Sequence, residues 1–334
     1  MLTLANILAA RATIAGIAEK TPMLKSDFLS KAAGQPFYLK LETMQPIGAF
    51  KLRGAVNALA HLPEGTRGVT CCSTGNHGRG VAYAARRAGM QALICMSALV
   101  PDTKRQAIEA IGGTLRIVGQ SQDDALRESQ RLAQEEGLAE ISPFDNAHVI
   151  AGQGTIGLEI LEAVPEAALL LVPLSGGGLA AGVALAAKAI NPAIRVVGIS
   201  MDRGAAMHAS LQAGHPVEVT EHVSLADSLG GGIGLKNRLS FPLCRKWLDD
   251  VVLVTEEEIL HAMQALYFED GLVAEGASVV GSAALLSGKL SAPTGPVATI
   301  LTGRNVDMAV FTRIVSGQDV ALGDLKLRGR AYAT

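Results

Sequence analysis

A lysine beside an aromatic residue is the first feature of the sequence with chemical potential. Lys51 lies between Phe50 and Leu52, within the segment 46–55. A lysine in such a position usually extends its amine to water. When an aromatic ring desolvates it, the amine loses its proton more easily and becomes a nucleophile that can form a Schiff base with an aldehyde. This segment therefore suggests covalent catalysis by an amine.

A glycine-rich segment, SGGGL at 175–179, follows the apolar run 169–174. Its glycines let backbone N–H groups approach an oxyanion, and the helix that it opens adds positive partial charge at its N-terminus. Phosphate is the natural ligand of such a loop. An aldehyde cofactor that carries a phosphate needs both this loop and a reactive lysine, so one hypothesis accounts for both segments.

The same loop supports an alternative. Gly176, Gly178 and Ala181 form a G-x-G-x-x-A pattern after a strand, and Asp202 follows the next strand. This arrangement is close to a dinucleotide fingerprint and, taken alone, would predict an NAD-dependent oxidoreductase. That reading leaves Lys51 without a role.

The third segment, STGNHG at 73–78, again lies between an apolar strand and a helix. Ser73, Thr74 and the free N–H groups of the first helical turn form an anion site of a size suited to a carboxylate. The Asn76 amide is able to hydrogen-bond a phenolic or carbonyl oxygen. His77 is a candidate titrating group, although a histidine in the first turn of a helix is more often structural.

Strand-like runs alternate with helical patterns along most of the chain, which is typical of a doubly wound α/β fold. Such sheets bind ligands in the loops where their strands end, and the three segments share this layout of a strand, a short turn and then a helix or another tight turn. Strands are predicted at 37–41, 68–72, 92–96, 114–118, 169–174, 195–200, 251–255 and 297–302, and helices at 52–61, 77–88, 103–111, 121–136, 154–163, 179–190 and 256–269.

Composition excludes several classes of protein. The 334 residues are 49% hydrophobic and 18% charged, which excludes a disordered chain, and their net charge of −2 without a long basic block argues against nucleic acid. The four cysteines have neither metal-ligand nor disulfide-framework spacing, so we expect a cytoplasmic protein. The uncharged stretch 167–187 imitates a membrane span, but Pro173 and three glycines divide it into strand, loop and helix.

Taken together, the motifs resemble those of fold-type II pyridoxal-phosphate enzymes of the threonine dehydratase/serine racemase branch. The matching stretches are TPM (21–23), LKLETMQPIGAFKLRGA (39–55), STGNHGRGVAYAA (73–85), AGQGTIGLEIL (151–161), PLSGGGLAAG (173–182) and LTGRNVD (301–307). The resemblance implies a tryptophan synthase β-like α/β fold of two open twisted-sheet domains, with the cofactor in the cleft between them. It implies a large domain over 1–51 and 147–334, a smaller inserted domain over 52–146, no regulatory domain, and a homodimer.

The resemblance also implies roles for individual residues. Lys51 matches the Schiff-base lysine and Phe50 the aromatic beside it, while Asn76 matches the asparagine that bonds the 3′-oxygen of pyridoxal 5′-phosphate. Thr302 takes the place of the hydroxyl residue that faces the pyridine nitrogen. The phosphate loop is matched by Ser175, Gly176, Gly177, Gly178 and Leu179, and the loop for the substrate carboxylate by Ser73, Thr74 and His77.

Some positions depart from the family pattern. Ser200 and Ala206 stand where related enzymes carry carboxylates for a divalent cation, so no metal is expected. Thr74 replaces the serine that racemases use as an acid/base, which puts racemisation in doubt. The segments 202–211 and 227–235 look more like those of the hydroxyectoine-utilisation dehydratases. The resemblance thus implies a lyase that eliminates water from a β-hydroxy-α-amino acid, with an amino acid racemase as the alternative.

Overall fold

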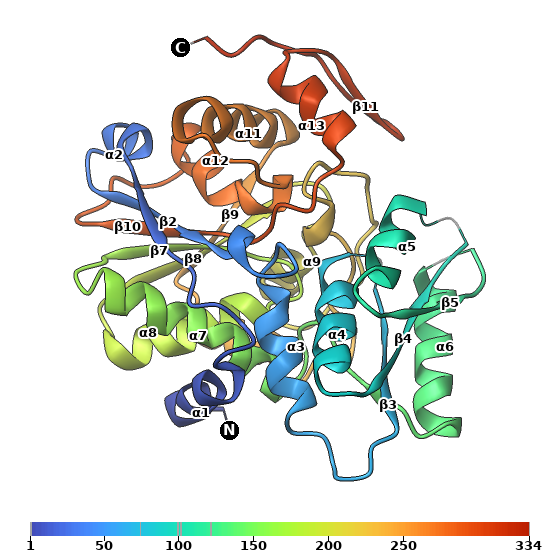
Figure 1. Ribbon diagram of the computed structural model, residues 1–334. Helices are drawn as coiled ribbons and strands as arrows, with labels where there is room; N and C mark the ends of the chain where they lie inside the picture. Colours follow the sequence, from blue (N-terminus) through green and yellow to red (C-terminus); the bar gives the residue numbers. More distant parts are fainter. Residues whose placement is uncertain (1, 74, 99, 101, 121, 334) are drawn as a thin grey trace.

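The computed structural model describes residues 2–73, 75–98, 100, 102–120 and 122–333. Its larger sheet has six strands in the order β1–β2–β10–β7–β8–β9, and every neighbouring pair is parallel except β1 with β2 (Figure 1). These strands are β1 (Met23–Ser26), β2 (Phe37–Leu41), β7 (Leu169–Pro173), β8 (Arg195–Met201), β9 (Asp250–Val254) and β10 (Val297–Leu301). The α/β architecture expected from the alternating pattern is confirmed; the antiparallel edge strand β1 was not expected.

Helices cover both faces of this sheet. The helices α7 (Ala147–Ala163) and α8 (Gly178–Ile190) lie on one face, and α11 (Glu256–Asp270) and α12 (Val280–Leu286) lie on the other (Figure 1). All five residues of β7 are buried, and they alternate between the two sides: Leu169 and Leu171 belong to one core cluster, Leu170 and Val172 to the other. This double burial explains the uninterrupted apolar run of the sequence.

The smaller sheet has four parallel strands in the order β5–β4–β3–β6. Its strands are β3 (Gly68–Cys72), β4 (Gln91–Met96), β5 (Thr114–Ile117) and β6 (Ala139–Glu140), and α3 (Lys51–Leu59), α4 (Asn76–Arg87), α5 (Asp102–Glu109) and α6 (Gln122–Glu135) accompany it. In chain order this sheet lies between β2 and β7. The domain limits at 51/52 and 146/147 stay a prediction.

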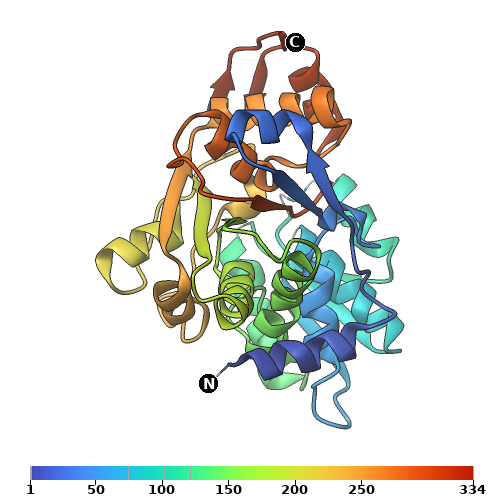
Figure 2. The same ribbon diagram turned by 90° about the vertical axis from the view of Figure 1, so that its left-hand side faces the viewer.

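The remaining elements close the ends of the molecule. The helix α1 (Leu4–Ile14) runs along α7 at the edge opposite the C-terminus (Figure 2). The others are α2 (Asp27–Ala33), α9 (Ala206–Ala213), α10 (Ser240–Trp247), α13 (Met308–Val315), β11 (Val320–Leu322), β12 (Leu325–Leu327) and the short 3-10 helices η1 (Glu42–Met44), η2 (Asp227–Leu229) and η3 (Gly276–Ser278).

The helix predicted at 154–163 begins earlier, at Ala147, where the Asn146 side chain accepts the N–H groups of His148 and Val149. Its glycines concealed the helical pattern, since they serve packing: a Cβ on Gly152 would lie 2.6 Å from the Arg53 carbonyl oxygen. The stretch 167–187 forms β7, the loop and α8, as predicted. Within the described part of the chain, no helix has the length and apolarity to cross a membrane.

Candidate active site

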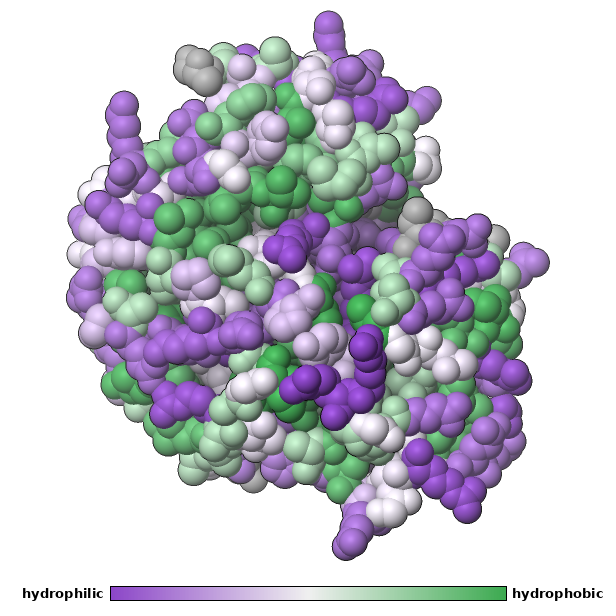
Figure 3. Space-filling model, in the orientation of Figure 1, coloured by the Kyte–Doolittle hydropathy of each residue, from purple (hydrophilic) through white to green (hydrophobic). Residues whose placement is uncertain are grey.

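A cavity of about 760 Å³ lies between the elements of the two sheets and brings the three sequence segments together. On the face shown in Figure 3, hydrophilic side chains gather along the boundary between the two parts of the molecule. The predicted site residues that line the cavity are Phe50, Lys51, Ser73, Asn76, His77, Ser175, Gly176, Gly177, Gly178, Leu179 and Thr302. Thr74, predicted to be catalytic, lies outside the described residues.

Lys51 is the first residue of α3, and its amine enters the cavity. The Nζ atom donates a hydrogen bond to the Pro143 carbonyl oxygen at 3.1 Å and lies 5.3 Å from the centroid of the Phe50 ring. Burial lowers the pKa of Lys51 to about 8, although the Glu275 carboxylate opposes that shift. At pH 7 about a tenth of the amine is therefore in the uncharged, nucleophilic form, against less than about a thousandth at the ordinary lysine pKa.

The glycine loop presents unpaired donors to the cavity. Gly176, Gly177 and Gly178 are buried, and among the described residues no acceptor pairs with the peptide N–H groups from Gly176 to Ala180. Buried N–H groups are rarely left without a partner, so these donors fit an anion at the start of α8. Gly177 has a φ of 87°, and a Cβ there would lie 2.6 Å from Met207 Cε. The loop thus fits a phosphate, which supports the predicted role.

Thr302 lies at the end of β10 and is 3% exposed. Its Oγ1 is 3.0 Å from Ser278 Oγ, and its carbonyl oxygen accepts the Phe50 N–H at 2.9 Å. Ser278 also donates to the Gly303 carbonyl oxygen and accepts the Gly303 N–H, both at 2.7 Å. Ser278, which sequence reasoning did not single out, therefore holds the Thr302 hydroxyl and the following glycine in place.

Asn76 opens α4 and takes part in a chain of hydrogen bonds. Its Nδ2 donates to the Glu275 carboxylate at 2.9 and 3.2 Å, and its Oδ1 accepts Asn305 Nδ2 at 2.7 Å. Asn305 in turn accepts Arg79 Nη1 at 2.8 Å. Because an amide nitrogen carries two hydrogens, Asn76 keeps one for a ligand in the cavity.

The family of the chain follows from a direct match. Residues 14–303 match the family model described as pyridoxal-phosphate dependent enzyme. This chain belongs to that family. Family members use pyridoxal phosphate, and the reactive lysine and the unpaired N–H groups of the loop fit that cofactor.

Comparison with individual relatives shows to which branch of the family the chain belongs. A provisionally named threonine dehydratase of Sinorhizobium fredii is 53% identical, over 95% of this chain and 96% of its own. An L-threonine ammonia-lyase of Thermotoga maritima is 39% identical, over 95% of this chain and 79% of its own. The structure of maize serine racemase is 34% identical and has a TM-score of 0.88, covering 93% of this chain and 96% of its own. This pyridoxal-phosphate enzyme therefore belongs to the threonine dehydratase/serine racemase branch, whose relatives named here include lyases.

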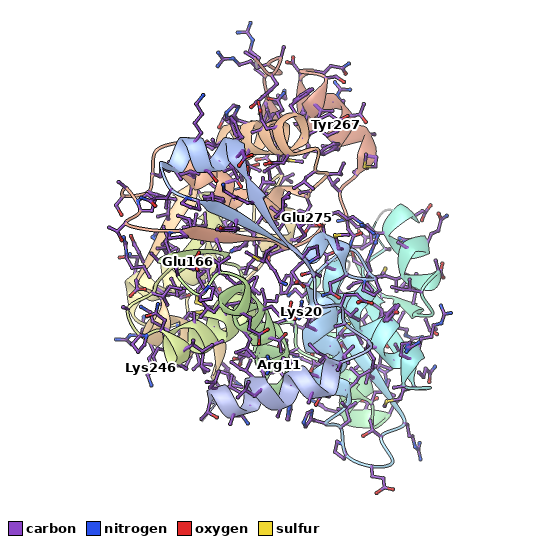
Figure 4. The ribbon with its side chains drawn as sticks, turned by 60° about the vertical axis from the view of Figure 1, so that its left-hand side comes forward. Arg11, Lys20, Glu166, Lys246, Tyr267 and Glu275 are labelled. Atoms are coloured by element: carbon purple, nitrogen blue, oxygen red, sulfur yellow. The ribbon has the colours of Figure 1, made fainter. Side chains whose placement is uncertain are left out.

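Glu275 is a second site residue that sequence reasoning missed. In Figure 4 it lies in the interior, between the larger sheet and the part of the chain around α3 and α4. It is 3% exposed, lines the cavity, and accepts Ser228 Oγ at 3.2 Å as well as Asn76. Burial, with a smaller effect from the nearby Asp227 carboxylate, raises the pKa of Glu275 to about 7. No periodic pattern in the sequence around position 275 indicates this burial.

In the cofactor-free protein, the free energy of unfolding should decrease as pH rises because Glu275 ionises, and we expect Glu275→Gln to abolish that decrease. Glu275 binds its proton more tightly when folded than when unfolded, so its stabilising effect is complete below its ordinary pKa of 4.5 and is lost as pH rises through about 7. The loss amounts to on the order of 3 kcal/mol. Urea unfolding should therefore show that the free energy of unfolding of the variant, relative to that of the wild type, is higher at pH 8 than at pH 5.5. Glu257→Gln, on the exposed side of α11, is the matched control; equal pH slopes for the wild type and Glu275→Gln would contradict the assignment.

His77 and Ser73 lie in the cavity wall. The His77 ring is 4% exposed, and its Nε2 is 2.7 Å from the Ile141 carbonyl oxygen. Burial and the nearby Lys51 charge lower the pKa of His77 to about 3. The ring is therefore neutral near pH 7, and Nε2 donates its hydrogen to the carbonyl. This geometry favours a positioning role for His77 over proton transfer, while Ser73 Oγ accepts the Gly75 N–H at 3.3 Å.

A buried cluster of charges lies behind Lys51. Arg53, the third residue of α3, is 1% exposed and donates to Glu42 at 2.8 Å and to Glu159 at 2.7 Å. Lys40 donates to Glu159 at 2.6 Å. These four side chains come from β2, η1, α3 and α7, and two positive charges face two negative ones. The cluster ties α3, the helix that carries Lys51, to β2, η1 and α7.

Proposed function

We propose that this enzyme is a dehydratase that removes water from a β-hydroxy-α-amino acid to give a 2-oxo acid and ammonia. The observation that carries the proposal is the meeting of the Lys51 amine and the unpaired N–H groups of the glycine loop in one cavity. Relatives named threonine dehydratase and threonine ammonia-lyase support the reaction class.

Pyridoxal phosphate, when bound, withdraws electrons from the α-carbon of the substrate. The N–H groups of Gly176 to Leu179 would hold its phosphate, and the second amide hydrogen of Asn76 would serve its 3′-oxygen. Lys51 Nζ, whose lowered pKa makes the uncharged form accessible near neutral pH, would take the α-proton as general base. The Thr302 hydroxyl would lie at the ring nitrogen and, because it is uncharged, would not keep a proton on it, which would favour loss of the β-hydroxyl over transamination. The β-hydroxyl would leave as water, with a proton from the phosphate that the loop holds.

The substrate carboxylate is assigned to the loop at the start of α4. Ser73 and Thr74 supply hydroxyls there, and His77 holds the loop against the Ile141 carbonyl. Thr74 remains our candidate for an acid/base on the face opposite Lys51. Its hydroxyl is the group that racemisation would need, so inversion is the alternative reaction that the assay must include.

The charge of the cavity lining restricts the charge of the substrate side chain that it can accept. Carboxylates outnumber amines there: the acidic residues are Glu140, Glu218, Glu221, Asp227 and Glu275, and the lysines are Lys51 and Lys104. Glu221 lies beside the glycine run 230–232, since a Cβ on Gly231 would be 3.7 Å from its Oε1. An acidic lining disfavours a second carboxylate on the substrate and favours a neutral or cationic side chain. A hydroxyectoine breakdown product resembling 3-hydroxy-2,4-diaminobutyrate fits, as do threonine and serine.

The test is a panel of β-hydroxy amino acids, both stereoisomers of each, assayed for ammonia release and for inversion. We expect kcat/KM for 3-hydroxy-2,4-diaminobutyrate, threonine or serine to exceed that for hydroxyaspartate at least about tenfold. In Glu221→Gln, kcat/KM should fall for the cationic substrate and stay unchanged for serine. Hydroxyaspartate as the best substrate would refute the charge argument, and inversion without ammonia would make the enzyme a racemase. We also propose a homodimer, which sedimentation would test.

A further inference from the structure

The glycine loop has a support that the sequence did not reveal. The helix α10 packs against it: Ser240 Oγ donates to the Gly176 carbonyl oxygen at 2.6 Å, and Cys244 Sγ lies 3.5 Å from the Gly177 carbonyl oxygen. Ser240 and Cys244 are both buried, and neither is among the residues that line the cavity. Their contacts reach the loop from outside the cavity.

The direction of these contacts determines where the loop N–H groups point. In a planar trans peptide the carbonyl oxygen and the following N–H point in opposite directions. The Gly176 and Gly177 carbonyls face α10, so the N–H groups of Gly177 and Gly178 face away from it. A peptide between two glycines turns over with little steric cost, because neither residue has a Cβ. The Gly177 carbonyl is held by α8 itself, because it accepts the Ala181 N–H at 2.8 Å. Among the described residues no backbone donor reaches the Gly176 carbonyl, so the orientation of the Gly176–Gly177 peptide depends on a group outside the loop.

The Ser240 hydroxyl is itself held in one direction. It accepts Asn237 Nδ2 at 2.8 Å, which leaves its single hydrogen for the Gly176 carbonyl. The Asp145 carboxylate then fixes the start of α10, because it accepts the N–H groups of Arg238, Leu239 and Ser240 at 2.9, 2.8 and 3.0 Å. A carboxylate at a helix N-terminus is well placed for such bonds.

The residues next to Asp145 contact the other parts of the cofactor site. A Cβ on Gly176 would lie 2.2 Å from Phe144 Cδ1, so the Phe144 ring packs directly against the loop. The Pro143 carbonyl oxygen accepts the Lys51 amine. The segment 143–145 therefore connects the reactive amine, the glycine loop and α10 within three residues.

We propose that Ser240 and Asp145 are positioning residues for the phosphate of the cofactor: they hold the Gly176–Gly177 peptide so that the loop N–H groups face the cavity. Neither side chain touches the phosphate. Their effect passes through the peptide orientation, and it is therefore specific to the phosphate group. The proposal concerns cofactor binding and stands independently of which substrate the enzyme accepts.

The test compares cofactors with and without a phosphate. Full-length Ser240→Ala, stripped of cofactor, is titrated with pyridoxal 5′-phosphate and with pyridoxal, and the ratio of the two dissociation constants is compared with that of the wild type. We expect affinity for pyridoxal 5′-phosphate to fall about tenfold, because the Gly176 carbonyl loses the Ser240 hydroxyl as donor, while affinity for pyridoxal stays unchanged. Ser26→Ala is the matched control: its buried hydroxyl donates to Asp270 and accepts the Leu29 N–H at the edge strand β1, and Ser26 does not line the cavity.

Asp145→Asn provides a second variant that leaves Ser240 in place. Its amide keeps one acceptor oxygen but sets an N–H₂ group against backbone donors, so we expect a smaller fall in the same direction. The phosphorus NMR signal of the holoenzyme should shift in both variants and not in the control. If both cofactor forms lose affinity equally in Ser240→Ala, or if neither does and the phosphorus signal is unmoved, the proposal is wrong.

Discussion

Lys51→Ala should abolish ammonia release and, with it, the visible absorbance that borohydride removes from the bound cofactor. In the proposed mechanism the Lys51 amine, with a pKa lowered to about 8, is both the group that links to the cofactor and the base for the α-proton. General-base catalysis alone typically contributes about 10²–10⁴-fold, and loss of the covalent link adds to that. Steady-state ammonia assays and absorbance spectra of purified variants would measure both effects.

Lys20→Ala is a suitable control for this variant. Lys20 is an exposed lysine that pairs with Glu162 on the surface, and it is not among the residues that line the cavity. Turnover and spectrum should both match the wild type. Ammonia release that survived in Lys51→Ala at near wild-type rate would show that another group provides the chemistry, and the assignment of Lys51 would have to be abandoned.

Arg53→Met should lower the free energy of unfolding by about 3–5 kcal/mol. The substitution removes one of two buried cations and leaves Glu42 and Glu159 opposite Lys40 alone. Burying an uncompensated carboxylate is costly, whereas the paired cluster itself contributes little. Because the cluster anchors α3, we also expect the Lys51 amine to be less well placed, so activity should fall along with stability.

Urea unfolding of Arg53→Met and of Arg11→Met would test this expectation. Arg11 also pairs with a glutamate, Glu162, but both side chains are about half exposed, at 45% and 44%. Exposed pairs of this kind contribute roughly 0–1 kcal/mol, so Arg11→Met should barely change the unfolding free energy. Equal losses for the two arginines would mean that burial of the cluster does not control its energetics.

Much of the fold could be predicted from local patterns. Apolar runs such as 169–174 and 297–302 indicated buried strands, and the polar and glycine segments after them indicated ligand-binding loops. Helices with weak or interrupted patterns were missed, among them α9, α10 and α12. The sequence of α10, SFPLCRKW, alternates too irregularly to indicate that it supports the glycine loop.

The sequence indicates some of the site residues and not others. Lys51, Asn76 and the glycines 176–178 lie in short motifs whose residue types already suggest their chemistry. Glu275 and Asp145 do not: each is a single carboxylate in an irregular segment, where an acidic residue is usually solvated. No local pattern marks Arg53 as buried, because Glu42 and Glu159, which pair with it, come from other elements.

The sequence by itself determined most of the alternating strands and helices, the family, and the residues able to form a covalent link and hold a phosphate. Only the tertiary structure decided which charges are buried, which N–H groups stay unpaired, and which carboxylates surround the amine. The physical reason is that pKa values, desolvation and peptide orientation depend on groups contributed by distant segments. Glu275 meets Asn76 across 199 positions of the chain, and no local pattern records that contact.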